Sequence, residues 1–359
     1  MELSEIRVRE LAKGKEVNIG IDVHKESWHI TIRSDGEELF KGRIRGSYEE
    51  LEKQLKRLSE CKIKVAYEAG PSGFWLYDKL TEVGIETIVT PPSLIPMEIG
   101  NKVKTDKRDS SKLAKLLEKG MLKKVHVLSE ESRGKREVLR TRRQLVEHKN
   151  DVARQIKSKL LFHGIESPFV KNQHWGKKYI KWLKELELKQ TALKTSINAL
   201  VALYEYLKGM IKELTKEIVF LSKTEKYKNQ VELLKTVPGI GTLTAMEIII
   251  EIGEIKRFGR AEQLSSYLGM TPSEYSTGGH IRQGRITHGG NKRLRSALVE
   301  SSWILISKDR LMRQKYETIK YRRGAKRAIT AIARRLSSII RIILIKNEAY
   351  RYEALLKRH

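Results

Sequence analysis

The stretch VNIGIDVHKESWHITIRSDGEELFKGRIRG, residues 17–46, decides the fold. It contains three strand-like runs rich in Val, Ile and Thr, and a turn at Gly36 joins the second run to the third. An amphipathic segment over residues 48–58 and a further strand-like run, KIKVAYEAG, follow. This order predicts an α/β domain and fits a ribonuclease-H-like (RuvC-like) fold, although other α/β folds share the same coarse order.

The alternation of strands and helices continues to about residue 120. The run ETIVTPP, residues 86–92, is typical of a strand, and the apolar spacing predicts a helix over residues 109–119. A chain of 359 residues is long enough for two or three domains. We place the first of them at residues 14–128.

The chain carries a formal net charge of +28, from 72 Lys and Arg against 44 Asp and Glu. Such an excess repels itself unless a polyanion neutralises it, so nucleic acid is the first candidate partner. The sequence argues against a membrane protein or a secreted protein, because it has no run of about 20 apolar residues and its N-terminus lacks the apolar core of a signal peptide. We expect a cytoplasmic protein associated with the nucleoid.

Cys61 is the only cysteine, which excludes an internal disulfide and a zinc site built on several thiolates. The nine histidines form no tight cluster in the sequence. Any metal is therefore expected to have carboxylate ligands, which suit a hard ion such as Mg²⁺ or Mn²⁺.

Residues 129–230 are highly charged and predict long helices whose apolar residues recur every seven positions. One such set is Leu139, Val146, Ala153 and Leu160. A second set alternates spacings of four and three: Leu193, Ile197, Leu200, Tyr204, Leu207, Ile211, Leu214, Ile218 and Leu221. Two helices with such seams form a coiled coil, either as a hairpin within one chain or between chains, and residues 163–175 are the expected connection.

The third region, residues 231–359, opens with LLKTVPGIGTLTAMEIIIEIG, two apolar helices around a tight PGIG turn. A helix-hairpin-helix unit, whose turn presents backbone N–H groups to a phosphate, and a plain packing motif both have this pattern. A glycine-rich basic loop follows. The last helices, over residues 311–346, carry eleven Lys and Arg against the single acid Glu317, which favours a nucleic-acid-binding surface.

Four acids occupy positions suited to phosphoryl transfer. Asp22 and Glu68 end strand-like runs, and Asp106 and Asp109 share a face if a helix begins there. Clustered carboxylates can hold two divalent ions about 3.5 to 4 Å apart, which activate a nucleophile and stabilise a leaving oxygen. A single acid is usually solvated, however, and Asp109 is also placed to cap the following helix. The basic residues around the second pair, which would attract a phosphate, are Lys102, Lys104, Lys107 and Arg108.

Ser276 lies in PSEYSTGGHIRQGRITHGG, residues 272–290, where glycines permit a close backbone approach. Arg282 and Arg285 are candidates for holding a phosphate beside it. A serine hydroxyl is a weak nucleophile without a base or a metal, and a loop serine beside Thr-Gly-Gly is usually part of a turn. The neighbours that compete for the same role are Ser273, Tyr275 and Thr277.

Six motifs occur in one order over nearly the whole chain: GIDVHK, AYEAGPSGFWLY, KTDKRDS, TVPGIG, YLGMTPSEYSTGG and GRITHGGNKRLR. In this combination the chain resembles the DEDD-type insertion-sequence transposases of the IS110 family, which are also described as bridge-RNA-guided recombinases. The resemblance implies a RuvC-like tetrad of Asp22, Glu68, Asp106 and Asp109. It also implies that Ser276 is the serine of the C-terminal transposase domain.

The resemblance further implies DNA recombination for a mobile element. Mg²⁺ held by the tetrad would help Ser276 to attack the scissile phosphate, and a hydroxyl of the other DNA would resolve the phosphoserine. Donor and target DNA, a structured guide RNA, and a homodimer or tetramer are the implied partners. Further nucleic-acid contacts are assigned to Arg282, Arg285, Lys292 and Arg293.

Two other interpretations stay open. One is a metal-only, structure-selective nuclease in which Ser276 has no role. The other is a non-catalytic RNA- or DNA-binding protein whose acids are structural.

Overall fold

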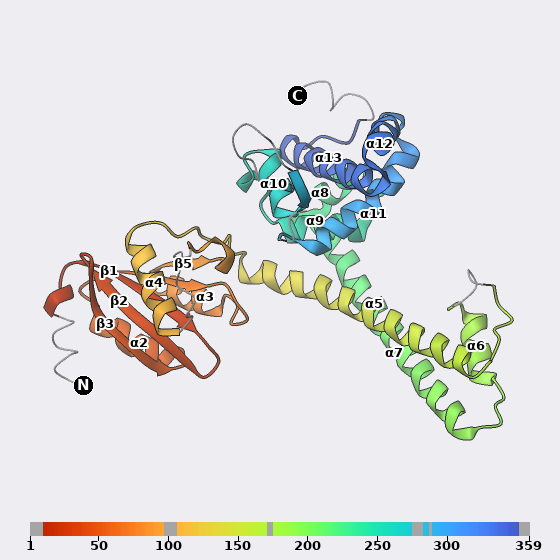
Figure 1. Ribbon diagram of the computed structural model, residues 1–359, viewed down its shortest axis with the longest axis horizontal. Helices are drawn as coiled ribbons and strands as arrows, with labels where there is room; N and C mark the ends of the chain where they lie inside the picture. Colours follow the sequence, from red (N-terminus) through yellow and green to blue (C-terminus); the bar gives the residue numbers. More distant parts are fainter. Residues whose placement is uncertain (1–9, 97–105, 171–174, 275–282, 287–288, 352–359) are drawn as a thin grey trace. The chain divides into compact units, whose positions relative to one another are not determined.

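A computed structural model gives the fold and describes residues 10–96, 106–170, 175–274, 283–286 and 289–351. The chain divides into two compact units, Met1–Val127 and Leu128–His359. The first is a mixed α/β unit and the second is mostly helical, which confirms the predicted α/β start and mainly helical remainder (Figure 1).

The N-terminal unit is built on a five-stranded sheet in the order β3-β2-β1-β4-β5. Its strands are β1 (Glu16–Val23), β2 (Ser27–Ser34), β3 (Glu37–Arg45), β4 (Lys62–Glu68) and β5 (Glu86–Thr90). The first three strands are antiparallel, β4 runs parallel to β1, and β5 runs parallel to β4. This order agrees with the ribonuclease-H-like expectation, which stays a prediction.

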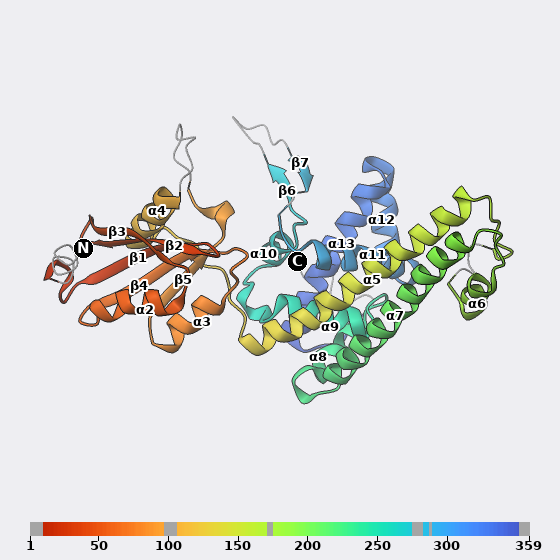
Figure 2. The ribbon, with the colours of Figure 1, turned by 90° about the horizontal axis from the view of Figure 1, so that it is seen from below.

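Each face of the sheet packs on different helices, because successive side chains of a strand point to opposite faces. Val17, Ile19 and Ile21 of β1 share a core with α2 (Tyr48–Arg57) and α3 (Trp75–Glu82). The opposite face packs on α4 (Asp106–Glu118), so the sheet lies between α2 and α3 on one side and α4 on the other (Figure 2). Helix α4 begins three residues before the predicted start, and so includes Asp106.

Two long antiparallel helices begin the second unit. Helices α5 (Glu130–Phe162) and α7 (Thr191–Ser222) run side by side in Figures 1 and 2, and residues of both predicted seams form one buried cluster. The connection is longer than residues 163–175, because it contains the short helix α6 (Lys177–Glu185). A true coiled coil, within or between chains, stays a prediction.

The remaining helices share one large core. They are α8 (Glu225–Lys235), α9 (Thr242–Ile252), α10 (Ala261–Tyr267), α11 (Lys292–Lys308), α12 (Arg310–Arg323) and α13 (Ala325–Lys346). A short antiparallel pair, β6 (Pro272–Glu274) and β7 (Gln283–Ile286), lies between α10 and α11 in the sequence. The boundary proposed at residues 230–231 falls inside α8, and the three-domain division stays a prediction.

The PGIG turn packs on α11. Gly239 adopts φ +92°, and a β-carbon there would lie 2.5 Å from the carbonyl oxygen of Ser301. At Gly239 the turn therefore serves the packing of α11, which is what the interpretation as a plain packing motif predicts. Within the described residues, no helix has the length and apolar character needed to cross a bilayer.

Candidate functional site

Asp22 and Glu68 come to neighbouring strand ends. Strands β1 and β4 pair in parallel as far as Ile21 with Tyr67, and the two acids are the next residue on each strand. Because cross-strand neighbours point to the same face, both acids lie on the face that packs on α4. Both are partly exposed, so they are accessible at the carboxyl edge of the parallel part of the sheet.

Gly20 allows α4 to sit against this edge. A β-carbon at Gly20 would lie 2.2 Å from the carbonyl oxygen of Ser110, a distance that no real β-carbon can tolerate. The hydroxyl of Ser110 lies 3.0 Å from that of Thr31, which pairs with Gly20 on β2. These buried contacts fix the first turns of α4 on the face that bears Asp22. Asp109, the residue before Ser110, is thereby carried to the same face.

The side chain of Asp22 has an imidazole as its neighbour. Nε2 of His24 lies 3.1 Å from Oδ2 of Asp22, whose side chain is only 15 % exposed. The carbonyl oxygen of His24 accepts a hydrogen bond from the indole of Trp28, which closes the turn after β1. His24 was missed in the sequence analysis, although its place two residues after Asp22 in GIDVHK was the available signal.

The described side chains do not form a complete metal cage. Among the residues whose side chains the structure describes, no three His, Cys, Asp or Glu side chains gather closely enough to hold a metal ion. Asp106 opens α4, but its side chain and that of Lys107 lie outside the described part, as do Lys102 and Lys104 entirely. Arg108 is exposed in the first turn of α4. The donor set is nevertheless one of carboxylates, which fits Mg²⁺ or Mn²⁺ in its chemistry.

A buried carboxylate anchors the second unit. The side chain of Glu251 on α9 is 2 % exposed and accepts hydrogen bonds from Arg140 of α5 at 2.9 and 3.2 Å. Arg136 lies 3.4 Å away, and Asn291 donates to the same carboxylate at 3.0 Å. Burial raises the pKa of Glu251, but the hydrogen bond from Arg140 and the charges of both arginines outweigh it and hold that pKa below its usual value. We call these four residues the Glu251 anchor.

The Glu251 anchor also holds together the two ends of the chain that flank the Ser276 segment, which we define as residues 270–289. We call these two flanking ends the neck of the serine segment. The hydroxyl of Tyr267 donates to the carbonyl oxygen of Glu251 at 2.8 Å, and the amide of Asn291 donates to the carbonyl oxygen of Tyr267 at 2.8 Å. A β-carbon at Gly290 would lie 2.4 Å from the amide nitrogen of Gly269, so the chain entering and leaving the segment touches backbone to backbone. Glu251 was not predicted to be functional, because MEIIIEIG, residues 246–253, indicates only an apolar helix.

The residues predicted within that segment are mostly outside the described part. Ser276 and Arg282 lie outside it, together with Tyr275 and Thr277, and Arg285 lies in β7 with its side chain outside it. Beyond the segment, Lys292 is exposed and Arg293 partly buried in the first turn of α11, which the Asn291 side chain caps. The acids and the serine belong to different compact units.

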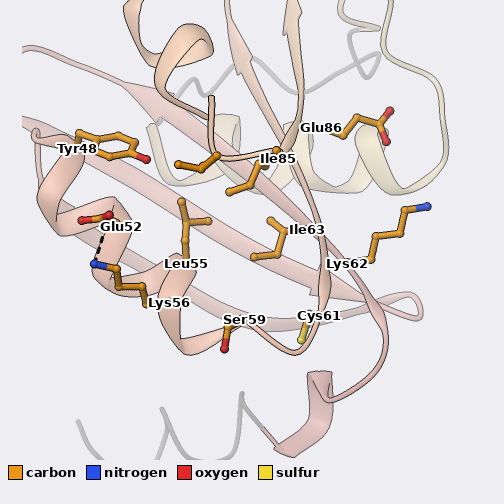
Figure 3. A pocket seen from close by; sticks show the side chains of 12 residues that line it. Tyr48, Glu52, Leu55, Lys56, Ser59, Cys61, Lys62, Ile63, Ile85 and Glu86 are labelled. Atoms are coloured by element: carbon orange, nitrogen blue, oxygen red, sulfur yellow. Dashed lines mark ion pairs between the residues drawn. The ribbon is translucent and has the colours of Figure 1, made fainter. Parts of the chain in front are cut away.

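The N-terminal unit also has a hollow of about 470 Å³, whose lining residues are drawn in Figure 3. Its walls include Tyr48 and Leu55 of α2 and Ile63 near the start of β4. Ile63 pairs with Val17, so it faces α2 and α3, and it lies at the opposite end of β4 from Glu68. The hollow therefore shares neither face nor strand end with the candidate site.

Comparison with known proteins identifies the family. Residues 231–317 match the model of the "Transposase IS116/IS110/IS902 family", and residues 19–164 match a DEDD-type IS110 transposase model. The protein y4qE of Sinorhizobium fredii, which carries a provisional transposase name, is 32% identical over 300 residues, 82% of this chain and 73% of its own length. The chain belongs to the IS116/IS110/IS902 family of transposases.

Two further relatives are named after their mobile elements. The transposase for insertion sequence element IS1533 of Leptospira borgpetersenii is 29% identical over 67% of this chain and 71% of its own length. The transposase for insertion sequence element IS1111A of Coxiella burnetii is 24% identical over 94% of this chain and 92% of its own. The family membership predicted from the six motifs is confirmed, and with it a DNA transposase of the DEDD type.

The two matched segments cover different parts of this IS110-family transposase. Residues 19–164 include α4, α5 and the sheet except the first three residues of β1, and so all four predicted acids. Residues 231–317 include α9, Glu251 and the segment that contains Ser276. The far end of the α5–α7 pair, with α6, lies largely between them.

Proposed function

We propose that this transposase cleaves and exchanges DNA strands through a phosphoserine intermediate. The metal-binding acids are Asp22, Glu68, Asp106 and Asp109, and the nucleophile is Ser276. The observation that carries the proposal is the convergence of Asp22, Glu68 and the start of α4 on one edge of the sheet. Family membership and the DEDD-type match over the same residues support it.

The acids suit a divalent cation of the Mg²⁺ or Mn²⁺ type, and DEDD-type transposase domains typically use such an ion. When bound, it would supply positive charge that stabilises the scissile phosphate and the leaving oxygen. The chain itself supplies the scaffold: Gly20 seats α4 on the sheet, and His24 orients Asp22. The basic residues before and within the first turn of α4, Lys102, Lys104, Lys107 and Arg108, would draw the DNA backbone to this edge.

In the reaction, Oγ of Ser276 forms an ester bond to phosphorus, its proton is released, and the oxygen of the leaving strand takes up a proton. A hydroxyl of the second DNA then attacks the phosphoserine, joins the strands and restores the serine. One ester bond forms for each that breaks, so no nucleoside triphosphate is consumed. We assign Arg282, Arg285 and Arg293 to the charged transition state.

In this proposal a structured guide RNA selects the DNA sites. The protein would contact the sugar-phosphate backbone of the RNA, and base pairing between RNA and DNA would supply the sequence specificity. The net charge of +28 supports the binding of both RNA and DNA, because their phosphates would neutralise it. Because the acids and Ser276 belong to different compact units, a homodimer or tetramer that combines units of different protomers is part of the proposal.

The test incubates purified protein with the guide RNA, labelled DNA and Mg²⁺, and then denatures the mixture. We expect a covalent protein–DNA adduct that Ser276→Ala abolishes and that Ser273→Ala and Thr277→Ala retain. Cleavage without an adduct would identify a metal-only nuclease, and binding without cleavage a non-catalytic protein. Either result would overturn the serine mechanism.

A further inference from the structure

A basic hollow lined by aromatic rings lies on the part of the α5–α7 pair that is nearest to α6. Its volume is about 320 Å³, at the lower end of the range for small-ligand sites. The lining residues are Lys149, Asn150, Ala153, Arg154 and Lys157 of α5, with Trp175 and Tyr204. We call it the α5–α7 hollow; it contains none of the residues assigned above to DNA cleavage.

The ring of Trp175 packs against two tyrosine rings in the wall of this hollow. It stacks on Tyr204 with centroids 4.7 Å apart and an interplanar angle of 30°, and its centroid lies 5.2 Å from that of Tyr179. Both tyrosines are buried in the core beneath it. The backbone of Trp175 adopts φ +70°, a conformation that bulky residues rarely adopt and that persists only where the surrounding packing holds it.

Two lysines of α5 lie near these rings. Nζ of Lys157 lies 5.9 Å from the ring centroid of Trp175, and Nζ of Lys149 lies 6.0 Å from that of Tyr204. Neither forms an ion pair with a carboxylate in the part of the chain that the structure describes, whereas Arg154 pairs with Asp151. Both ammonium groups can therefore turn to a phosphate without breaking an ion pair.

The positive charge continues on the other side of Tyr204. A second hollow of about 490 Å³ shares this residue and is lined by α6 and α7. Its lysines are Lys177, Lys181, Lys184, Lys208 and Lys212. Residues 149–212 contain 13 Lys and Arg against 5 Asp and Glu, an excess that favours a polyanionic partner.

We propose that the α5–α7 hollow binds an unstacked nucleotide of single-stranded RNA or DNA, with its base on Trp175 and its phosphates on Lys149 and Lys157. This rests on the proposed function only in taking nucleic acid as the partner. The two lysines are eight residues apart, about 12 Å along a helix that rises 1.5 Å per residue, so they contact a stretch of backbone rather than one phosphate. A basic groove with an aromatic stacking platform is how proteins hold single strands without reading their sequence.

The base exchanges places with an ammonium group. Lys157 lies over the ring of Trp175 in the free protein, and an incoming base takes that face while the lysine moves to the adjoining phosphate. A duplex keeps its bases stacked inside, so it offers the hollow phosphates but no base. Single-stranded segments are therefore bound in preference to duplex.

The first experiment locates the base. Full-length protein is irradiated with single-stranded RNA, single-stranded DNA or duplex DNA of one sequence that carries 5-iodouracil, and the crosslinked peptides are mapped. We expect a crosslink at Trp175 with a single strand and none there with the duplex. A crosslink with RNA only assigns a guide strand, and one with DNA only assigns a substrate strand. Crosslinks that avoid Trp175 in both overturn the proposal.

The second experiment tests the lysines. Affinity for the same single strands is measured over a range of salt for the Lys149→Gln, Lys157→Gln double variant and for Lys159→Gln, which removes a charge from the same helix outside either hollow. Log K falls as log salt rises, and loss of two phosphate contacts should make this fall shallower by about 1.4 in slope, at about 0.7 per contact. The control keeps the wild-type slope.

The outcomes separate this inference from the function on which it rests. If wild-type protein binds no nucleic acid, the proposed function fails. If wild-type protein binds but the double variant behaves like Lys159→Gln, only the α5–α7 hollow is excluded. If no Ser276 adduct forms but the double variant still shows the shallower salt dependence, the serine mechanism fails and the inference about the hollow stands.

Discussion

Asp22 and Glu68 owe their proximity to a single pairing register. Ile21 pairs with Tyr67, so the next residue of each strand emerges on the same face of the sheet. A shift by one residue would turn either acid toward α2 and α3. The hydrophobic alternation of β1 and β4 fixes this register, so it also fixes the position of both acids in the candidate site.

At the residue scale, Asp22→Asn is expected to abolish strand cleavage and to leave RNA affinity nearly unchanged. The substitution removes the charge of one metal ligand but none of the basic surface. Chelation of divalent ions by EDTA should have the same two effects. Gel assays of labelled DNA and filter binding of RNA measure them.

The control for this prediction is Asp35→Asn, which makes the same change in the exposed turn between β2 and β3. Asn tolerates the positive φ of that position. Cleavage by Asp22→Asn at the rate of Asp35→Asn would remove Asp22 from the site.

Glu251→Gln is expected to destabilise the second unit by about 3 kcal/mol, because Arg136 and Arg140 would lose a buried counter-charge. The value is at the low end of the usual range because the side chain of Arg140 is 30% exposed. Urea unfolding measures it. Glu217→Gln, an exposed acid on α7, should change stability by less than about 0.5 kcal/mol; equal effects would refute the role of the Glu251 anchor.

The stability that Glu251 contributes should also depend on pH. Its pKa in the folded protein is lowered, so the contribution is present above the ordinary carboxyl pKa of 4.5 and is lost as the pH falls below 4.5 through the folded value. The difference in unfolding free energy between wild type and Glu251→Gln should therefore shrink on acidification. A difference that grows below pH 4.5 would contradict the lowered pKa.

At the scale of elements, the seating of α4 on the sheet depends on Gly20. In Gly20→Ala the β-carbon meets the backbone of Ser110, so α4 must move away. We expect a loss of about 1–3 kcal/mol or more in unfolding free energy, with cleavage reduced because Asp109 moves with the helix. Circular dichroism melts and cleavage assays measure the two effects.

The same substitution should have the opposite sign inside α5. A β-carbon at Gly134 has no neighbour within 4 Å, so Gly134→Ala should stabilise the helix by up to about 1 kcal/mol. If both glycine variants lost equal stability, close approach at Gly20 would not be the cause.

At the scale of the whole molecule, a net charge of +28 makes nucleic-acid binding an electrostatic process. Affinity for RNA or DNA should fall by about a thousandfold or more between 50 and 200 mM salt, as expected for roughly six or more phosphate contacts. Fluorescence anisotropy measures it. Sucrose at matched osmolality controls for dehydration, and a flat salt dependence would contradict the assignment.

The strands of the N-terminal sheet were predictable, because alternation in 17–46 and 62–70 has the period of a strand, whereas the short pair β6 and β7 lies in a segment expected to be a glycine-rich loop. The ends of the helices were less predictable from the sequence. Helix α4 starts at Asp106 rather than Asp109, and the connection after α5 contains α6, because short helices carry few periodic positions. Gly20 looked like an ordinary strand residue, since its role depends on a helix that begins 86 residues later in the chain.

By itself, the sequence determined the family, the α/β start and the long helices, and it pointed to the four acids as candidates, because periodicity, charge and ordered motifs are local properties. Only the tertiary structure decided that β1, β4 and α4 meet at one edge, that Glu251 holds both α5 and the neck of the serine segment, and that Trp175 walls a basic hollow. Each of these depends on contacts between residues far apart in the chain, and such contacts form only when the elements pack.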